Sequence, residues 1–313
     1  MLDTTRILLA SALLASLTVA RAGDAANYLG RWDVTLSTPG HDYATWLEIT
    51  QMNGKLAVRM VGRWGHPRWL PQAELTDLGL RFVSGAADEG RKDDMVFEGR
   101  LEGRALVGET HGPDGAVWTW RGERAPDLKR SAAPAWGRPV TLFNGKDTQG
   151  WHVSDANVKN TWTVEDGRLV SNGNGPELIT DDKFNDFKLH VEFNVGKGAN
   201  SGIYLRGRYE VQVEDDAIPE PPQQGLGGVY GFLAPTKVPP SEAGKWRTYD
   251  ITLVGRHVTV VLDGATIIDN QEIPGPTGGA LDSREGAAGP IYLQGSENGR
   301  VAYRNLRIVP ARK

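Results

Sequence analysis

Two glutamates and a glutamine alternate along one short segment, and their spacing could support acid–base chemistry. The segment is Tyr209–Asp215, in which Glu210, Gln212 and Glu214 alternate with valines. Alternate side chains of a β-strand share a face, so the polar groups would line one face while the valines enter the core. Two carboxyl groups on one face can divide the acid and base or nucleophile roles of glycosidic cleavage. The glutamate Cα atoms would lie roughly 13 Å apart. Retaining glycosidases need carboxyl groups about 5–5.5 Å apart, so these side chains would have to converge strongly.

Other strand-like segments also carry polar or aromatic side chains at alternate positions. Their mixture of carboxylates, amides, arginine and tyrosine is suited to a ligand rich in hydroxyl groups. A solvated sheet face would produce the same alternation in each strand separately, so both interpretations stay open. The candidates that these segments add to a polyol-binding face are Glu192, Tyr204, Arg206, Tyr292 and Gln294.

The composition excludes several other kinds of chemistry. The chain has no cysteine, which rules out disulfides, thiolate catalysis and iron–sulfur clusters. Its net charge of −4 argues against nucleic acid as the main partner, because phosphate binding needs a basic field. The six histidines form no H-E-x-x-H cluster, so a zinc site is not expected. No cofactor is certain, and a divalent cation such as calcium, held by Asp and Glu in a loop, is left open.

Strand-like alternation dominates the chain, which predicts an all-β protein of two units. Residues 23–125 alternate in short runs separated by turn signals such as Asn53-Gly54 and Glu102-Gly103. This pattern predicts a small antiparallel meander or barrel. Its tryptophans are interpreted mainly as packing residues, with a sugar-stacking surface as the alternative. Residues 126–138 lack periodicity and are predicted to be a linker.

The second unit, residues 139–313, holds about ten strand-like runs joined by tight turns such as Asp263-Gly264, and a β-sandwich is expected. One connection, Ala217–Ser241, is rich in proline and glycine and is long for an inert loop. Long ordered loops are more often functional than accidental, so this loop is a candidate for a functional role.

The first 22 residues have the pattern of a secretory signal. Arg6 precedes the apolar run Ile7–Ala20, and Ala20-Arg21-Ala22 fits the small-x-small cleavage rule. The run is short for a membrane span, so cleavage after Ala22 is expected, leaving no span in the mature chain. The predicted location is the periplasm or the exterior of the cell.

Seven segments of the second unit together form a recognisable pattern. They are LFNGKDTQGW (Leu142–Trp151), FKLHVEF (Phe187–Phe193), NSGIYLRGRYEVQVED (Asn200–Asp215), VYGFLAP (Val229–Pro235), GKWRTYDITLVG (Gly244–Gly255), GGALDS (Gly278–Ser283) and GPIYLQG (Gly289–Gly295). In this order, and over nearly all of residues 138–310, the second unit resembles the 3-keto-disaccharide hydrolase domain family, formerly a domain of unknown function with a concanavalin-like jelly-roll fold. The resemblance does not cover residues 23–125.

The resemblance implies action on a glycoside already oxidised at C3. A C3 ketone acidifies the C2 hydrogen, so a base can remove it and the enolate can expel the aglycone before water adds. On this scheme Glu210 is the expected base, and Glu214 or Asp215 the acid. Arg206 would stabilise the enolate electrostatically, a role that a divalent cation could replace. The side chains expected to hold sugar hydroxyls are Gln212, Tyr230 and Tyr292.

Two alternatives differ in class from this scheme. The first is a retaining endo-glucanase that uses Glu210 and Glu214, although Gln212 stands where such glucanases usually carry aspartate. The second is a non-catalytic carbohydrate-binding protein. In its favour, Ser296-Glu297-Asn298-Gly299 replaces the Asp-His-Gly type of turn expected after the last matching segment.

Overall fold

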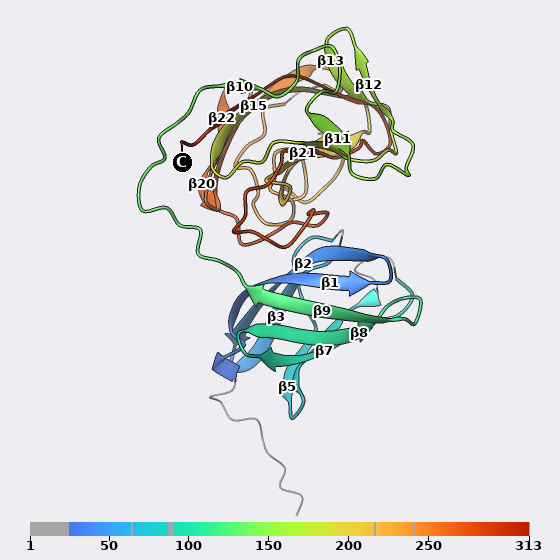
Figure 1. Cartoon of the computed structure of the whole chain (residues 1–313), viewed down its shortest axis with the longest axis vertical. Helices are drawn as coiled ribbons and strands as arrows, with labels where there is room; N and C mark the ends of the chain where they lie inside the picture. The colour runs from blue at the N-terminus through green and yellow to red at the C-terminus, as the bar shows by residue number, and fades with distance from the viewer. Residues whose placement is uncertain (1–24, 64, 87–90, 216, 241, 313) are drawn as a thin grey trace, which may run out of the picture.

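The computed structural model describes residues 25–63, 65–86, 91–215, 217–240 and 242–312, and its named elements are all β-strands. Figure 1 shows one curled sheet below and a two-sheet sandwich above. The predicted all-β class is therefore confirmed. Within the described ranges no helix is long and apolar enough to cross a membrane. The predicted signal segment, residues 1–22, lies outside them.

The first unit is a single antiparallel sheet of nine strands that curls around its own core. Its strand order is β4-β3-β2-β1-β9-β8-β7-β6-β5, and every neighbouring pair is a hairpin except β1–β9. The strands are β1 (Gly30–Thr38), β2 (His41–Met52), β3 (Lys55–Val61), β4 (Arg68–Trp69), β5 (Gln72–Thr76), β6 (Gly79–Ser84), β7 (Met95–Glu102), β8 (Ala105–His111) and β9 (Val117–Arg124).

Large aromatic side chains fill the inside of this curl. Trp32 is fully buried, and the ring of Trp120 packs against Phe82 and Phe97, whose rings stack at 4.9 Å. Gly99 and Gly108 leave the space that the Trp120 ring occupies. Among the tryptophans that the structure describes here, Trp32, Trp46 and Trp120 are buried packing residues, whereas Trp69 is about half exposed.

The second unit is a sandwich of two antiparallel sheets. The larger sheet contains β10 (Val140–Thr141), β12 (Trp162–Glu165), β13 (Arg168–Ser171), β15 (Phe187–Val195), β18 (Trp246–Val254), β19 (His257–Leu262), β20 (Ala265–Glu272) and β22 (Val301–Pro310). The smaller sheet has the order β11-β14-β21-β16-β17. Its strands are β11 (Trp151–Val153), β14 (Leu178–Thr180), β16 (Asn200–Leu205), β17 (Tyr209–Glu214) and β21 (Tyr292–Leu293).

The sandwich core lies between the inward faces of these two sheets. On β15 the odd-numbered residues from Phe187 to Val195 point inward, while the intervening polar residues face away. On β17 Val211 and Val213 enter the core as predicted, but every residue of the strand is buried, so its other face is covered as well.

The predicted linker runs along the sandwich and is bonded to it. Arg130 makes a two-pronged ion pair with Asp186, with distances of 2.6 and 3.0 Å. Trp136 forms a β-bridge with Ala311, and the carbonyl of Leu128 lies against Gly255. Whether the two units fold independently stays a prediction.

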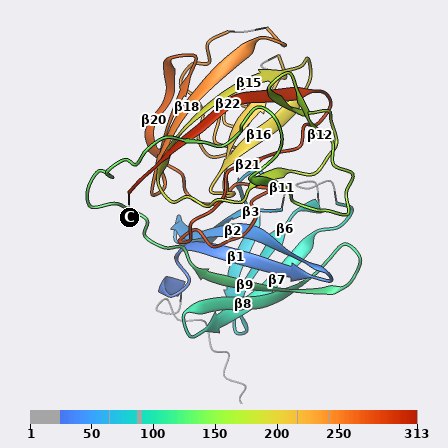
Figure 2. The same cartoon turned by 45° about the horizontal axis from the view of Figure 1, so that its top comes forward.

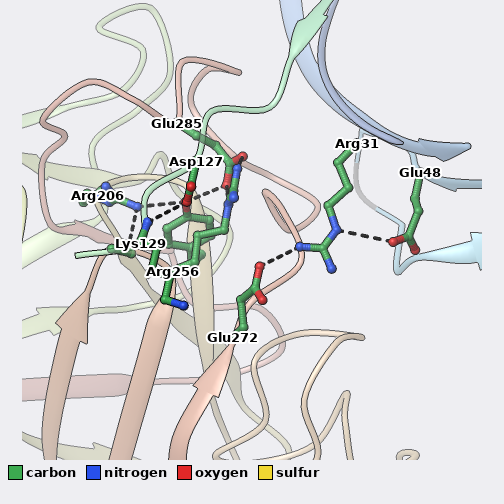
Figure 3. A network of polar contacts seen from close by, with 10 residues as sticks. Arg31, Glu48, Asp127, Lys129, Arg206, Arg256, Glu272 and Glu285 are labelled. Atoms are coloured by element: carbon green, nitrogen blue, oxygen red, sulfur yellow. Dashed lines mark hydrogen bonds and ion pairs between the residues drawn. The ribbon is translucent and has the colours of Figure 1, made fainter. Parts of the chain in front are cut away.

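The outward face of β1–β3 packs on the sandwich, as Figure 2 shows. Trp46 meets Phe232 edge-on at 5.4 Å, and the Arg59 guanidinium lies 5.3 Å from the same Phe232 ring. At one border Arg31 bridges Glu48 of its own sheet and Glu272 of the sandwich (Figure 3).

A buried polar cluster lies in the same contact. Glu285 is fully buried and accepts hydrogen bonds from Arg256, at 2.6 and 3.0 Å, and from the Tyr209 hydroxyl at 2.6 Å. Figure 3 shows Arg206 and Arg256 beside it. From the opposite unit, the buried Asp33 of β1 interacts with Glu285, and burial together with that negative charge raises the pKa of Asp33 to about 9.

This cluster makes the stability of the protein depend on pH. As the pH rises from about 4 to about 9, an unfolded Asp33 ionises while the folded one stays neutral, so its contribution to stability is lost over that interval. Asp33→Asn keeps a hydrogen-bonding side chain without this loss. We expect its melting temperature to exceed the wild-type value increasingly toward pH 9, by at least ~3 °C there.

Melting curves at several pH values test this expectation, with exposed Asp77→Asn as the control. If the difference in melting temperature between wild type and Asp33→Asn stays constant across this pH range, the raised pKa of Asp33 is contradicted.

Candidate active site

The predicted polar face lies on the β16–β17 hairpin of the smaller sheet. The register places Glu210 opposite Tyr204, Gln212 opposite Gly202, and Glu214 opposite Asn200. The structure therefore brings Glu210, Gln212 and Glu214 onto one face, as the alternation predicted.

Glycine at position 202 makes room for the Glu210 side chain. A Cβ atom there would lie 2.1 Å from Glu210 Oε1, a distance that real contacts do not reach. Beside it, the rings of Tyr204 and Tyr292 stack in parallel at 4.1 Å. The carboxyl group thus occupies a fitted space bounded by an aromatic pair.

Glu210 is only 4% exposed, and this burial controls its protonation. Burial raises its pKa to about 8, and the negative charges of Glu297 and Glu214 act in the same direction. The hydrogen bond from Tyr204, 2.9 Å from Oε2, lowers the pKa in part. The carboxyl group can therefore gain or lose a proton near neutral pH.

The Tyr204 hydroxyl has two acceptors but only one proton. Its oxygen lies 2.9 Å from Glu210 Oε2 and 2.9 Å from the carbonyl oxygen of Gly278. When Glu210 is neutral, the acid can donate to the phenol, which donates onward to Gly278. When Glu210 is ionised, the charge-assisted bond to the carboxylate is the stronger use of the phenol proton. Tyr204 thus accommodates both protonation states of the glutamate.

Glu214 forms a second centre of acid–base character on the same face. Burial raises its pKa to about 7, with smaller contributions of the same sign from Glu220 and Asp215. Gln212 donates to Glu214 at 3.4 Å and to Asn200 Oδ1 at 3.1 Å. The pKa values of the two glutamates are about 8 and about 7, so each carboxyl group can exchange a proton near neutral pH.

Two buried amide oxygens on this face lack partners in the part of the chain that the structure describes. They are Gln212 Oε1 and Gln294 Oε1. A buried acceptor without a donor is costly unless a ligand supplies one. Both oxygens are therefore suited to accept hydrogen bonds from sugar hydroxyls, which agrees with the predicted roles of these residues.

Tyr230 reaches the same region from the long loop. Its backbone N–H donates to the Glu210 carbonyl at 3.0 Å. Burial, followed by the charge of Glu210, raises the pKa of its phenol to about 12, so the hydroxyl keeps its proton at neutral pH.

Sequence reasoning missed three contributors to the site. Glu297 supplies negative charge to Glu210, and it comes from the turn in which Asp-His-Gly was expected. The negative charge of Glu177 raises the pKa of the Tyr292 phenol. Thr277 accepts the Glu210 backbone N–H at 3.1 Å. The unusual turn was a usable signal for Glu297, whereas strand alternation says nothing about the other two.

The structure moves three predicted residues out of the predicted site. Arg206 follows the end of β16 with a positive φ of 54°, and its side chain bonds Tyr209 and the Gly255 carbonyl instead of facing Glu210. Glu192 belongs to the larger sheet and pairs there with Arg304 at 2.6 Å. Asp215 accepts backbone N–H groups of Gly198 and Ala217, so it supports loops.

The described residues contain no group of three His, Asp or Glu side chains placed to hold a metal ion. The divalent cation left open by the sequence therefore has no such group of ligands in those ranges.

The fold and the site define a two-sheet β-sandwich with two carboxyl groups of near-neutral pKa on one sheet face. Residues 138–309 match the 3-keto-alpha-glucoside-1,2-lyase-like domain family, and the chain belongs to this family.

A curated relative in Bacteroides thetaiotaomicron is named 3-keto-disaccharide hydrolase. It is 39% identical over 75 residues, which are 21% of this chain and 26% of that protein. The match thus spans about a quarter of the relative's length. Among solved structures, two proposed glycosyl hydrolases of Parabacteroides distasonis are similar. The first is 27% identical to this chain with a TM-score of 0.47, and the match covers 59% of this chain and 93% of that structure's chain. The second is 20% identical with a TM-score of 0.45, and the match covers 56% of this chain and 94% of that structure's chain.

The fitted space around Glu210 predicts a specific sensitivity at Gly202. Gly202→Ala forces the carboxyl group or the hairpin to move, and overpacking of this kind costs about 1–3 kcal/mol. Denaturant unfolding measures the loss. Gly286→Ala is the matched control because its Cβ would make only ordinary contacts, and it should change stability by less than ~0.5 kcal/mol. Equal stabilities of the two variants would show that the close approach is unimportant.

Proposed function

We propose that this protein is an exported hydrolase of 3-keto-glycosides that works by elimination followed by hydration. Membership of the lyase-like family supports the substrate class, and the name of the Bacteroides relative agrees with it. The observation that carries the proposal is the buried Glu210, whose pKa of about 8 suits a base that removes a carbon-bound proton.

The proposed reaction has two stages, elimination of the aglycone and hydration of the resulting double bond. The Glu210 carboxylate takes the C2 proton, and the C2–H electrons form the enolate of the C3 ketone. As the ketone re-forms, the double bond moves to C1–C2, and the C1–O bond breaks with its electrons on the aglycone oxygen. That oxygen takes a proton from an acid. Water then adds across C1=C2: its oxygen bonds to C1 as the acid residue takes its proton back, and Glu210 returns the proton to C2. The products are the free 3-keto sugar and both carboxyl groups in their starting states.

Glu214 is the proposed acid, because its pKa of about 7 keeps a substantial protonated fraction at neutral pH. It lies four positions beyond Glu210 along the strand, roughly 13 Å between Cα atoms, which leaves space for a sugar ring between the side chains. Such a separation suits two groups acting on different atoms of the substrate better than the close pair of a retaining glucanase.

The remaining polar groups bind and orient the sugar in this proposal. Gln212 and Gln294 accept hydroxyl hydrogen bonds with their unpartnered amide oxygens. The stacked Tyr204–Tyr292 pair provides an apolar plate beside the base. Tyr230 takes the place first assigned to Arg206, because its protonated hydroxyl can donate to the enolate oxygen.

A purely carbohydrate-binding role accounts for the orphaned amide oxygens. It gives no reason for two carboxyl groups with pKa values raised toward neutrality on one face. Perturbed carboxyl groups grouped in this way are more typical of catalytic sites.

The central prediction concerns Glu210 and the C3 ketone. Glu210→Gln keeps the size of the side chain but removes its basicity, so turnover of a 3-keto-glycoside should fall by about 10²–10⁴ with the fold intact. Exposed Glu98→Gln is the control and should keep wild-type turnover. Aglycone release is the measurement, with the matched unoxidised glycoside run alongside. Cleavage of both substrates at equal rates would rule out elimination, and full activity of Glu210→Gln would remove Glu210 as the base.

The same assay predicts a pH profile. The base must be ionised and the acid protonated, so kcat/KM should form a bell with limbs near pH 7 and pH 8. Rate–pH curves for wild type and Glu214→Gln test this, because loss of the acid should remove the basic limb. A basic limb that persists in Glu214→Gln would exclude Glu214 as the acid.

Export to the periplasm or the exterior is part of the proposal. The apolar run and the Ala20-x-Ala22 pattern predict a mature chain that begins at Gly23. N-terminal sequencing of the protein from the extracytoplasmic fraction measures this directly. A membrane-extracted chain that retains Met1 would contradict it.

A further inference from the structure

A cavity of about 310 Å³ opens on the curled sheet of the first unit, which the family match does not cover. Its volume is at the lower end of the range for small-molecule sites, so it suits a single ring. The walls combine aromatic and apolar side chains with two arginines. Its principal lining residues are Tyr43, Met60, Arg63, Arg91, Phe97 and Trp118.

Two hydrogen-bond donors of the lining residues lack acceptors within the described ranges. They are the buried N–H groups Trp118 Nε1 and Arg91 Nε. The Arg91 guanidinium is held in place, because Nη2 donates to Ser84 Oγ at 2.8 Å and to the Gly85 carbonyl at 3.0 Å. Fixed donors without acceptors are suited to a ligand that brings its own oxygen atoms.

Aromatic walls complete the recognition pattern. The Arg63 guanidinium lies 3.8 Å from the centre of the Tyr43 ring, so this ring is held at the side of the cavity. Phe97 and Trp118 add further apolar ring surface. Ring surfaces together with donors match a pyranose, which has apolar C–H faces and an edge of hydroxyl oxygens.

A short segment of the sandwich links this cavity to the Glu210 site. The carbonyl of Arg63, a lining residue, accepts the Gly279 N–H at 2.6 Å. The preceding carbonyl, that of Gly278, lies 2.9 Å from the Tyr204 hydroxyl, which bonds Glu210. Residues 277–279 therefore contact the cavity wall on one side and the proposed base on the other.

We propose that the cavity of the first unit binds the aglycone sugar of a disaccharide substrate. The proposal rests on the proposed function, because it assigns to the cavity the half of the substrate that leaves. It also gives the first unit a role in selecting disaccharides over glycosides with small aglycones.

The test uses Trp118→Phe in the full-length protein, since this change removes the indole donor and keeps an aromatic ring. Binding of unoxidised maltose is measured by ligand-observed NMR, because maltose lacks the C3 ketone and is not consumed by elimination. We expect its Kd to rise about 3- to 10-fold, the range for one hydrogen bond. Trp69→Phe on β4 is the matched control and should leave the Kd unchanged.

A second variant and a kinetic measurement separate a loss of sugar binding from a loss of folding or of turnover. Tyr43→Leu removes a ring wall and should also weaken maltose binding, with melting curves verifying that each variant is folded. On 3-keto-maltose, Trp118→Phe should raise KM with little change in kcat, while KM for methyl 3-keto-glucoside stays constant.

The outcomes separate this proposal from the proposed function. An unchanged maltose Kd in folded Trp118→Phe and Tyr43→Leu overturns the cavity assignment, even if 3-keto substrates are cleaved. Absence of turnover on every 3-keto substrate, with maltose binding weakened only in the cavity variants, overturns the proposed function and supports the cavity as a sugar site.

Discussion

The burial of one carboxyl group is the constraint on which the site depends. Glu210 lies on a sheet face that is covered rather than solvated, so its charged form loses hydration and its proton affinity rises. The glycine opposite leaves space for it, and one phenol serves both of its protonation states. Without that glycine the carboxyl group would be displaced, and without burial it would be an ordinary acid, ionised at neutral pH and a weak base.

The two units share more than a surface contact. Residues 277–285 of the sandwich touch the first unit through Gly279 and Ser283, and they contain Glu285 of the buried cluster. The same segment supplies Thr277 and Gly278 to the surroundings of Glu210. The polar contact between the units and the support of the proposed base are therefore parts of one continuous stretch of chain.

Strand alternation predicted much of this arrangement because a strand's two faces follow directly from its sequence. It placed Glu210, Gln212 and Glu214 together, and Tyr204, Tyr292 and Gln294 join them. Alternation does not say which sheet a strand enters, so Glu192 was assigned to the wrong one. It also fails where a strand ends, as at Arg206. The raised pKa values could not be predicted, because they depend on what covers the face.

Most residues of the site come from one short stretch of chain, and this has a consequence for protein engineering. Gly202, Tyr204, Glu210, Gln212 and Glu214 all come from one hairpin, and Tyr292 comes from the two-residue strand beside it. A grafted copy of these elements in another sandwich would carry the geometry of the pair. It would not carry the proton affinities, because those come from burial by the rest of the protein and from charges outside the hairpin, such as those of Glu297 and Glu220. A transferred site must therefore include the segments that bury this face of the hairpin.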